Sequence, residues 1–119
     1  MNTAQEIIDA YKNGQRYFVD IEMEDENFDG QNLEGIIFEK CFLYSSFQKA
    51  NLKNSKFING NIKTCDFTEA DLTNSHFENV LVEGTIFSEA KTDGIYFENN
   101  WYYGNQLTQS DFNKLKDEK

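Results

Sequence analysis

A large apolar residue recurs at every fifth position from Phe47 to Phe112, and this spacing limits the fold more than any other feature of the chain. A period of five matches neither the 3.6-residue period of a helix nor the two-residue period of a flat strand. It fits a chain that turns a corner every five residues and points one large side chain inward on each side. Self-similarity at a fixed period indicates a stacked repeat architecture. The series is Phe47, Leu52, Phe57, Ile62, Phe67, Leu72, Phe77, Val82, Phe87, Thr92, Phe97, Tyr102, Leu107 and Phe112.

A second series of mostly small residues precedes each large one by two positions, which predicts one large and one small inward residue per side. The upstream segment follows the same pattern if one residue is missing between Leu43 and Phe47, because Phe28, Leu33, Phe38 and Leu43 are in phase with one another. Aligned four repeats at a time, aromatic residues lie over aromatic ones, so the full period is twenty, and nineteen in the first coil. The small series is Ser45, Ala50, Ser55, Gly60, Cys65, Ala70, Ser75, Val80, Thr85 and Ala90.

Several stretches match the pattern A-[D/N]-L-x-x and thereby give the chain a family resemblance. Ala50-Asn51-Leu52-Lys53-Asn54 and Ala70-Asp71-Leu72-Thr73-Asn74 match it directly, and Cys65-Asp66-Phe67 is a usual variant. The chain resembles the pentapeptide repeat family over about residues 26 to 113. The resemblance implies an all-β fold, a right-handed quadrilateral β-helix with four repeats per coil and about four to five coils. It implies far less about function, because a scaffold does not name its partner.

The N-terminal segment, residues 1–25, is predicted to form a cap of one short helix and an entry strand. Thr3-Ala4-Gln5-Glu6 is a capping-box pattern, and Arg16 to Glu24 alternates loosely through Tyr17, Val19, Ile21 and Met23. The helix is either a partner-binding element or a lid on the first coil. We favour the lid, because open solenoid ends must be capped.

The C-terminal end of the repeat is predicted to decay. Asn100 and Asn105 replace the small inward residues of the fourth coil. The β-helix is expected over residues 26–113, with residues 114–119 as a polar tail, and the stretch from Asp111 to Lys119 reads as a frayed terminus. At the corners, Gly or Asn recurs two positions after the large residue, which is typical of turns that need a positive φ. These corner residues are Gly35, Asn54, Asn74, Gly94, Asn59, Asn79 and Asn99.

The chain is strongly acidic, with 21 Asp and Glu against 11 Lys and Arg and a formal net charge of −10. Such a charge disfavours direct binding of nucleic acid or of an anionic membrane, where positive charge supplies most of the affinity. It favours a basic partner, or simple solubility. Six acids in ten residues, from Asp20 to Asp29, form either a solvated surface or one that competes for a basic, nucleic-acid-binding face.

No residue pattern indicates catalysis, a cofactor or a metal. Cys41 and Cys65 both fall at small inward positions, so they are expected to be reduced packing residues, which points to a cytoplasmic protein. No signal-like or membrane-spanning run is present. His76 precedes a large residue and should face solvent, and an outward side chain on a convex rod has no water-excluding pocket. We therefore expect that the protein is not an enzyme.

The outward positions carry the functional information. Apolar and aromatic residues gather on two adjoining sides, whereas the outward residues next to Leu33, Leu52 and Leu72 are polar. A patch rich in Trp and Tyr is typical of an interface, and the alternative is that a terminal segment folds back over it. The outward apolar residues are Ile37, Phe42, Tyr44, Ile58, Leu81, Tyr96, Trp101 and Tyr103. The predicted partner-binding residues are Trp101, Tyr103, Tyr96, Leu81, Phe42, Tyr44, Glu22, Glu24 and Glu26.

Three functions are compatible with these features. The first is a small cytoplasmic protein that recognises or neutralises a specific protein partner, such as an immunity protein against a basic toxin, acting as a monomer or as a weak dimer through the aromatic face. The second follows from the resemblance, since known pentapeptide repeat proteins include acidic rods that protect DNA gyrase from quinolones by resembling DNA. The third is a structural repeat module without a strong partner.

Overall fold

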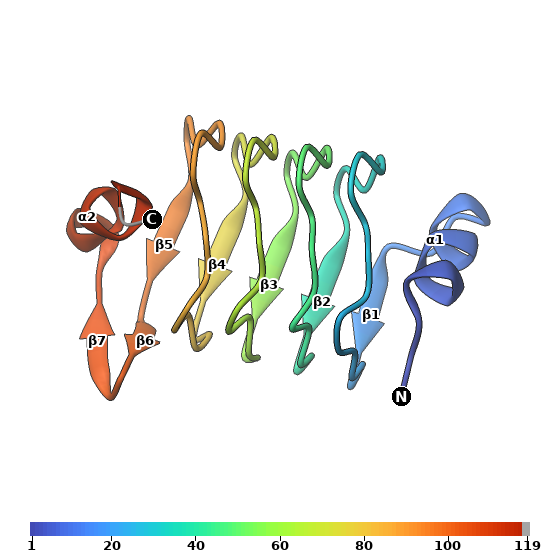
Figure 1. Cartoon of the computed structure of the whole chain (residues 1–119), viewed down its shortest axis with the longest axis horizontal. Helices are drawn as coiled ribbons and strands as arrows, with labels where there is room; N and C mark the ends of the chain where they lie inside the picture. The colour runs from blue at the N-terminus through green and yellow to red at the C-terminus, as the bar shows by residue number, and fades with distance from the viewer. Residues whose placement is uncertain (118–119) are drawn as a thin grey trace.

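The computed structural model describes residues 1–117 and shows a four-sided parallel β-helix of about four turns (Figure 1). One side is a five-stranded sheet whose strands pair in parallel in the order of the sequence. Its strands are β1 (Tyr17–Val19), β2 (Ile37–Glu39), β3 (Lys56–Ile58), β4 (His76–Glu78) and β5 (Tyr96–Glu98). The other three sides meet through single parallel bridges, such as Asn32 with Asn51 and Asn51 with Asp71. The predicted fold class is confirmed.

The strand register shows which coil is one residue shorter than the others. Phe38 pairs with Phe57, an offset of nineteen, whereas Phe57 pairs with Phe77 at an offset of twenty. Every coil therefore keeps its large residues in line although one coil is shorter. The backbone of Tyr44 has a φ of +26°, unlike the other non-glycine residues of positive φ, which lie between +48° and +61°. The shorter coil thus changes the corner at Tyr44 and leaves the core unchanged.

The core consists of phenylalanine stacks that run along the rod axis. The rings of Phe28 and Phe47 are 4.7 Å apart, those of Phe47 and Phe67 are 5.2 Å apart, and those of Phe67 and Phe87 are 5.5 Å apart. These separations lie close to the 4.7–4.9 Å spacing between paired strands, so each coil adds one ring to each stack. All four rings are fully buried. Burial of one such side chain stabilises the fold by roughly 2–3 kcal/mol.

The β-helix begins earlier than the sequence analysis predicts. Phe18 and Met23 are buried and continue the five-residue series in front of Phe28, and Phe18 pairs with Phe38. A strand, β1, is present in the predicted entry segment, but its alternating apolar residues Tyr17 and Val19 point outward and are exposed. Phe18 is inward because β1 adopts the same register as every later strand on its side.

The corners have the backbone conformation that their residues predict. All seven predicted corner residues have a positive φ, between +54° and +76°. Left-handed backbone costs an ordinary residue roughly 1–2 kcal/mol, and glycine and asparagine avoid most of this cost. The Gly and Asn residues at these positions therefore stabilise the turns.

The N-terminal segment closes the first coil. Helix α1 (Ala4–Lys12) begins after Thr3, whose side chain accepts a hydrogen bond from the Glu6 N–H, and its Ile7 and Ile8 are buried in the core. The segment also satisfies backbone groups around the open end. The Asn2 N–H donates to the Glu22 carbonyl, the Tyr11 hydroxyl to the Glu34 carbonyl, and the Gln15 amide to the Tyr17 carbonyl. Of the two interpretations of this helix, the contacts favour the lid.

The C-terminal end differs from the sequence prediction. Strands β6 (Asn100–Tyr102) and β7 (Asn105–Leu107) form an antiparallel hairpin, so Leu107 is not a further inward residue of the coil. A 3₁₀ turn, η1 (Gln109–Asp111), leads into helix α2 (Phe112–Asp117). The expected frayed terminus is therefore wrong for residues 111–117, and residues 118–119 lie outside the described residues.

Helix α2 closes the last coil through Phe112. The Phe112 ring lies 5.2 Å from that of Phe87 and 4.9 Å from that of Phe97, so it extends two phenylalanine stacks from outside the repeat. The side chain of Gln109 accepts a hydrogen bond from the Phe97 N–H and thereby satisfies the free edge of β5. Figure 1 shows helical segments at both ends of the rod and none along its sides.

Candidate functional site

The four sides of the rod are named by the inward residues of one coil: side 1 holds Phe57, side 2 Ile62, side 3 Phe67 and side 4 Leu72. On sides 3 and 4, several coils have an Asn or Asp directly before the inward residue, and its side chain accepts a hydrogen bond from the N–H of the residue that follows the inward one. Asp66 accepts from Thr68 at 2.9 Å, and Asp71 accepts from Thr73 at 3.1 Å. The polar side chain thus serves the local backbone, as Asx turns do elsewhere.

The ionisation of these aspartates follows from the same contacts. Partial burial raises the pKa of Asp66, but hydrogen bonds from Thr68 and Gln48 outweigh it, so the pKa lies below its ordinary value of 3.8. The pKa of Asp71 is also lowered, by hydrogen bonds from Thr73 against the effect of partial burial. Both side chains are therefore ionised near neutral pH and structural in role.

Side 2 carries aromatic and aliphatic residues in the same outward position. Phe42, Asn61, Leu81 and Trp101 follow one another along the rod through parallel bridges. Phe42 is 45 % exposed and Tyr103 71 % exposed, while Leu81 and Trp101 are half-buried. The outward position after the inward residue adds Tyr44 near the first coils and Tyr103 near the last.

Side 1 adjoins side 2 and extends the same surface. Tyr96 is 40 % exposed, and its ring stacks on that of His76 with centroids 4.1 Å apart. Ile37 and Ile58 are half-buried outward residues of β2 and β3. The structure therefore places all the predicted apolar residues on two adjoining sides, and their part in binding stays a prediction. Tyr17 and Val19 belong to this surface too, and sequence reasoning missed them because it placed residues 1–25 in a cap outside the β-helix.

The terminal segments leave this aromatic surface open. Helix α1 packs on the open end of the first coil and α2 on the end of the last, through Ile7, Ile8 and Phe112. The exposure of Phe42, Tyr96 and Tyr103 shows that neither segment folds back along the sides.

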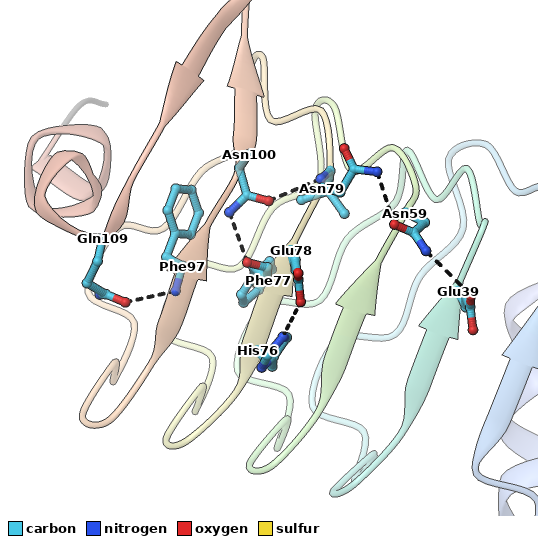
Figure 2. Close-up of polar contacts among 10 residues, drawn as sticks. Glu39, Asn59, His76, Phe77, Glu78, Asn79, Phe97, Asn100 and Gln109 are labelled. Atoms are coloured by element: carbon cyan, nitrogen blue, oxygen red, sulfur yellow. Dashed lines mark hydrogen bonds and ion pairs between the residues drawn. The ribbon is translucent and has the colours of Figure 1, made fainter.

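A line of side-chain hydrogen bonds runs along the corner between sides 1 and 2. The Trp101 indole N–H donates to Asn79, the Asn79 amide to Asn59, and the Asn59 amide to the Glu39 carboxylate, at 3.1, 3.0 and 3.5 Å. Figure 2 shows the part of this line that leads from Asn79 through Asn59 to Glu39. The Tyr17 hydroxyl donates to the other oxygen of Glu39. This ladder connects the last coil with the first strand and fixes the indole of Trp101 on the surface.

The three predicted acidic binding residues differ in their surroundings. Glu22 and Glu24 are exposed in the first coil. Glu26 accepts a hydrogen bond of 2.6 Å from the Ala4 N–H in the first turn of α1. A carboxylate at a helix N-terminus is favoured by the helix dipole and by the free N–H groups there. The structure therefore gives Glu26 a role within the chain, as part of the N-terminal cap.

The shortened coil opens a hollow at the corner between sides 2 and 3. It has a volume of about 360 Å³ and is lined by backbone and side chains of three successive coils. Tyr44 lies at its border with side 2, and its hydroxyl accepts a hydrogen bond from the Asn61 amide. The lining residues are Asp25, Glu26, Asn27, Tyr44, Ser45, Ser46, Thr64 and Asp66.

The reactive side chains are engaged in packing or in surface contacts. Burial raises the pKa of the Cys41 thiol to about 11 and that of the Cys65 thiol to about 12, so both stay protonated and weakly nucleophilic. Both cysteines are free and buried. His76 faces outward and contacts Glu78 at 2.9 Å. Within residues 1–117, no three His, Cys, Asp or Glu side chains are grouped so as to hold a metal ion.

No helix in the described part of the chain has the length and apolar character needed to cross a membrane.

Comparison with known proteins gives a family and a set of similar folds. A family model described as "Pentapeptide repeat region" matches residues 31–112. Among solved structures, QnrB1, a plasmid-mediated fluoroquinolone resistance protein, has a TM-score of 0.60 and 18 % identity, over 71 % of this chain and 47 % of that one. HetL, a pentapeptide repeat protein involved in heterocyst differentiation regulation from the cyanobacterium Nostoc sp. strain PCC 7120, has a TM-score of 0.49 and 21 % identity, over 84 % and 40 %. The chain spans about half the length of these proteins or less. No curated protein matches it.

Proposed function

This chain belongs to the pentapeptide repeat family, and from that membership and its surface we propose that it is a non-catalytic acidic module that binds one specific protein partner. The observation that carries the proposal is the open aromatic surface on sides 1 and 2. Outward positions on a rod that meets only water are expected to be polar, as they are on side 4 and, apart from Ile86, on side 3. Here they include the chain's only tryptophan, Trp101, and the exposed Phe42 and Tyr103.

The negative charge of the chain favours a basic protein as the partner. The net charge of −10 speeds association with a positive surface and suppresses wrong partners of like charge. The basic catalytic domain of a toxin has the required positive charge, and this chain would then act as its immunity or inhibitor protein. Two buried thiols held protonated and an outward His76 support a binding role over a catalytic one.

Protection of DNA gyrase by DNA mimicry is the second candidate. The observation in its favour is that carboxylates face outward on sides 3 and 4 as well, including Asp66, Asp71 and Asp93. The likeness to the fluoroquinolone resistance protein supports a shared fold alone. A DNA mimic needs a charged surface and gains nothing from exposed aromatic residues, so this candidate ranks second.

The proposal predicts that Trp101→Ala weakens partner binding by at least about thirty-fold while the chain stays folded. A desolvated Trp at an interface contributes at least about 2 kcal/mol, which corresponds to that factor. The measurement is a quantitative pull-down from the native host with the wild-type chain, Trp101→Ala and Thr73→Ala, whose altered side chain lies on side 4. A partner retained by Thr73→Ala and lost by Trp101→Ala is the expected result. If the captured proteins bind all three chains equally, the aromatic surface is not the binding site.

A further inference from the structure

Side 2 changes its chemical character from one end of the rod to the other. Its leading outward position holds Glu22 in the first coil and Trp101 in the last. Its trailing position holds Glu24 in the first coil and Tyr103 in the last. Side 2 is therefore acidic in the first coil and aromatic in the last, and the aromatic Phe42 and Tyr44 adjoin the acidic coil in the second.

The charged residues between these ends neutralise one another. Lys63 and Glu83 form an ion pair at 3.3 Å, and the Tyr103 N–H also donates to Glu83. The middle of side 2 therefore adds no net charge. The acidic end gains a concave element, because the hollow beside Tyr44 is lined by Asp25 and Asp66.

We propose that the partner binds side 2 through a single segment whose cationic residues meet the first coil and whose large apolar residues meet the last. This inference rests on the proposed function and names the chemistry of the partner. A Lys or Arg side chain of the segment enters the hollow beside Tyr44, while apolar side chains cover Leu81, Trp101 and Tyr103. Opposite charges within a desolvated contact favour specific pairing, and a second copy of this chain has no cationic end on side 2 to meet the acidic first coil.

The dimensions of side 2 limit the length of the segment. Five outward positions in successive coils span about 19 Å at the usual strand spacing. A helix of about 13 residues or an extended stretch of about six has this length.

The test uses a library of random 16-residue peptides displayed on phage and selected on the whole immobilised chain. Enriched peptides are expected to carry Lys and Arg in one half and large apolar residues in the other. Their affinities are then measured for the wild type, Trp101→Ala, the double variant Glu24→Gln with Asp25→Asn, and a control, Glu89→Gln with Asp93→Asn. The control removes the same charge away from side 2, and all four altered acidic side chains are exposed. Glu26 is left unchanged because it caps α1.

Substitutions at the acidic end and at the aromatic end of side 2 should differ in how their effects depend on salt. The acidic double variant is expected to weaken binding at least about five-fold at low salt, and the difference should vanish near 1 M salt, where the Debye length is about 3 Å. Trp101→Ala should weaken binding at least about ten-fold at either salt concentration. The control should change affinity less than about two-fold.

The direction of binding is read from energy transfer between Trp101 and a dansyl group on the peptide. Transfer should be greater with the label on the apolar end than on the cationic end. The inference would be overturned by equal transfer from both ends, or by enriched peptides whose cationic and apolar residues are not separated into two halves. It would also be overturned if the two double variants had equal effects, or if no peptide were enriched. If one of these occurs while the pull-down still depends on Trp101, the segment is wrong and the proposed function stands. If partner capture in the pull-down does not depend on Trp101 either, the inference and the proposed function are both contradicted.

Discussion

At the scale of single residues, the position before each inward side chain decides whether a side of the rod is polar or apolar. Where it holds Asp or Asn, as at Asp66 and Asp71, the side chain bonds to the backbone two residues on. Where it holds Leu81 or Trp101, that local bond is given up and an apolar group faces solvent. Loss of a hydrogen bond costs about 1 kcal/mol, so these substitutions are expected where another contact compensates.

Two inward serines give a matched test of how the small positions contribute. The Ser55 hydroxyl is buried without a hydrogen-bond partner, whereas the Ser75 hydroxyl, one coil further on, donates to the Leu72 carbonyl at 2.7 Å. Ser55→Ala should leave the free energy of unfolding unchanged or raise it, and Ser75→Ala should lower it by about 1 kcal/mol. Urea unfolding of both variants measures the difference. Equal losses would mean that Ser55 has a partner in solution.

At the scale of elements, the helices act as lids, and the hydrogen bonds explain why both ends need one. An open coil exposes a row of unpaired backbone groups and a ring of apolar side chains. Asn2, Tyr11 and Gln15 bond to the backbone at one end, and Gln109 bonds to it at the other. These contacts close both ends of the core, and the sides remain open for binding.

The C-terminal lid predicts a large effect at Phe112. Phe112→Ala removes a buried ring that contacts Phe87 and Phe97, and the cavity should lower the free energy of unfolding by roughly 3–5 kcal/mol. Asn113→Ala changes an exposed neighbour in the same helix and should cost under about 0.5 kcal/mol. Thermal unfolding compares the two variants. Similar melting temperatures would show that α2 does not pack on the last coil in solution.

Both ends show what the five-residue spacing could not predict. Leu107 and Phe112 continue the spacing although the chain has left the coil: Leu107 lies in the hairpin and is only partly buried, whereas helix α2 returns Phe112 to the core. A second signal was present, since Thr108 and Asp111 form a capping box directly before α2. At the other end, Phe18 and Met23 fit the spacing, but the alternation around them was misleading.

At the scale of the whole molecule, the chain is a rod of 37 × 25 × 21 Å that is closed at both ends. Its coils, register and phenylalanine stacks follow from the sequence, because a period of twenty leaves few other ways to bury so many phenylalanine rings. The two-sided aromatic surface could also be placed from the sequence, since outward positions are fixed once the inward ones are known. The hollow beside Tyr44 and the role of Glu26 could not, because both depend on contacts between coils or with α1.

Binding along the sides of the rod is most directly measured through Trp101, the only tryptophan of the chain. Its fluorescence reports whether a partner captured in the pull-down covers sides 1 and 2. On formation of the complex, we expect the emission to move to shorter wavelength and quenching by iodide to fall, because the half-buried indole becomes desolvated. A partner that binds while the emission and the quenching of Trp101 stay unchanged would contradict the account.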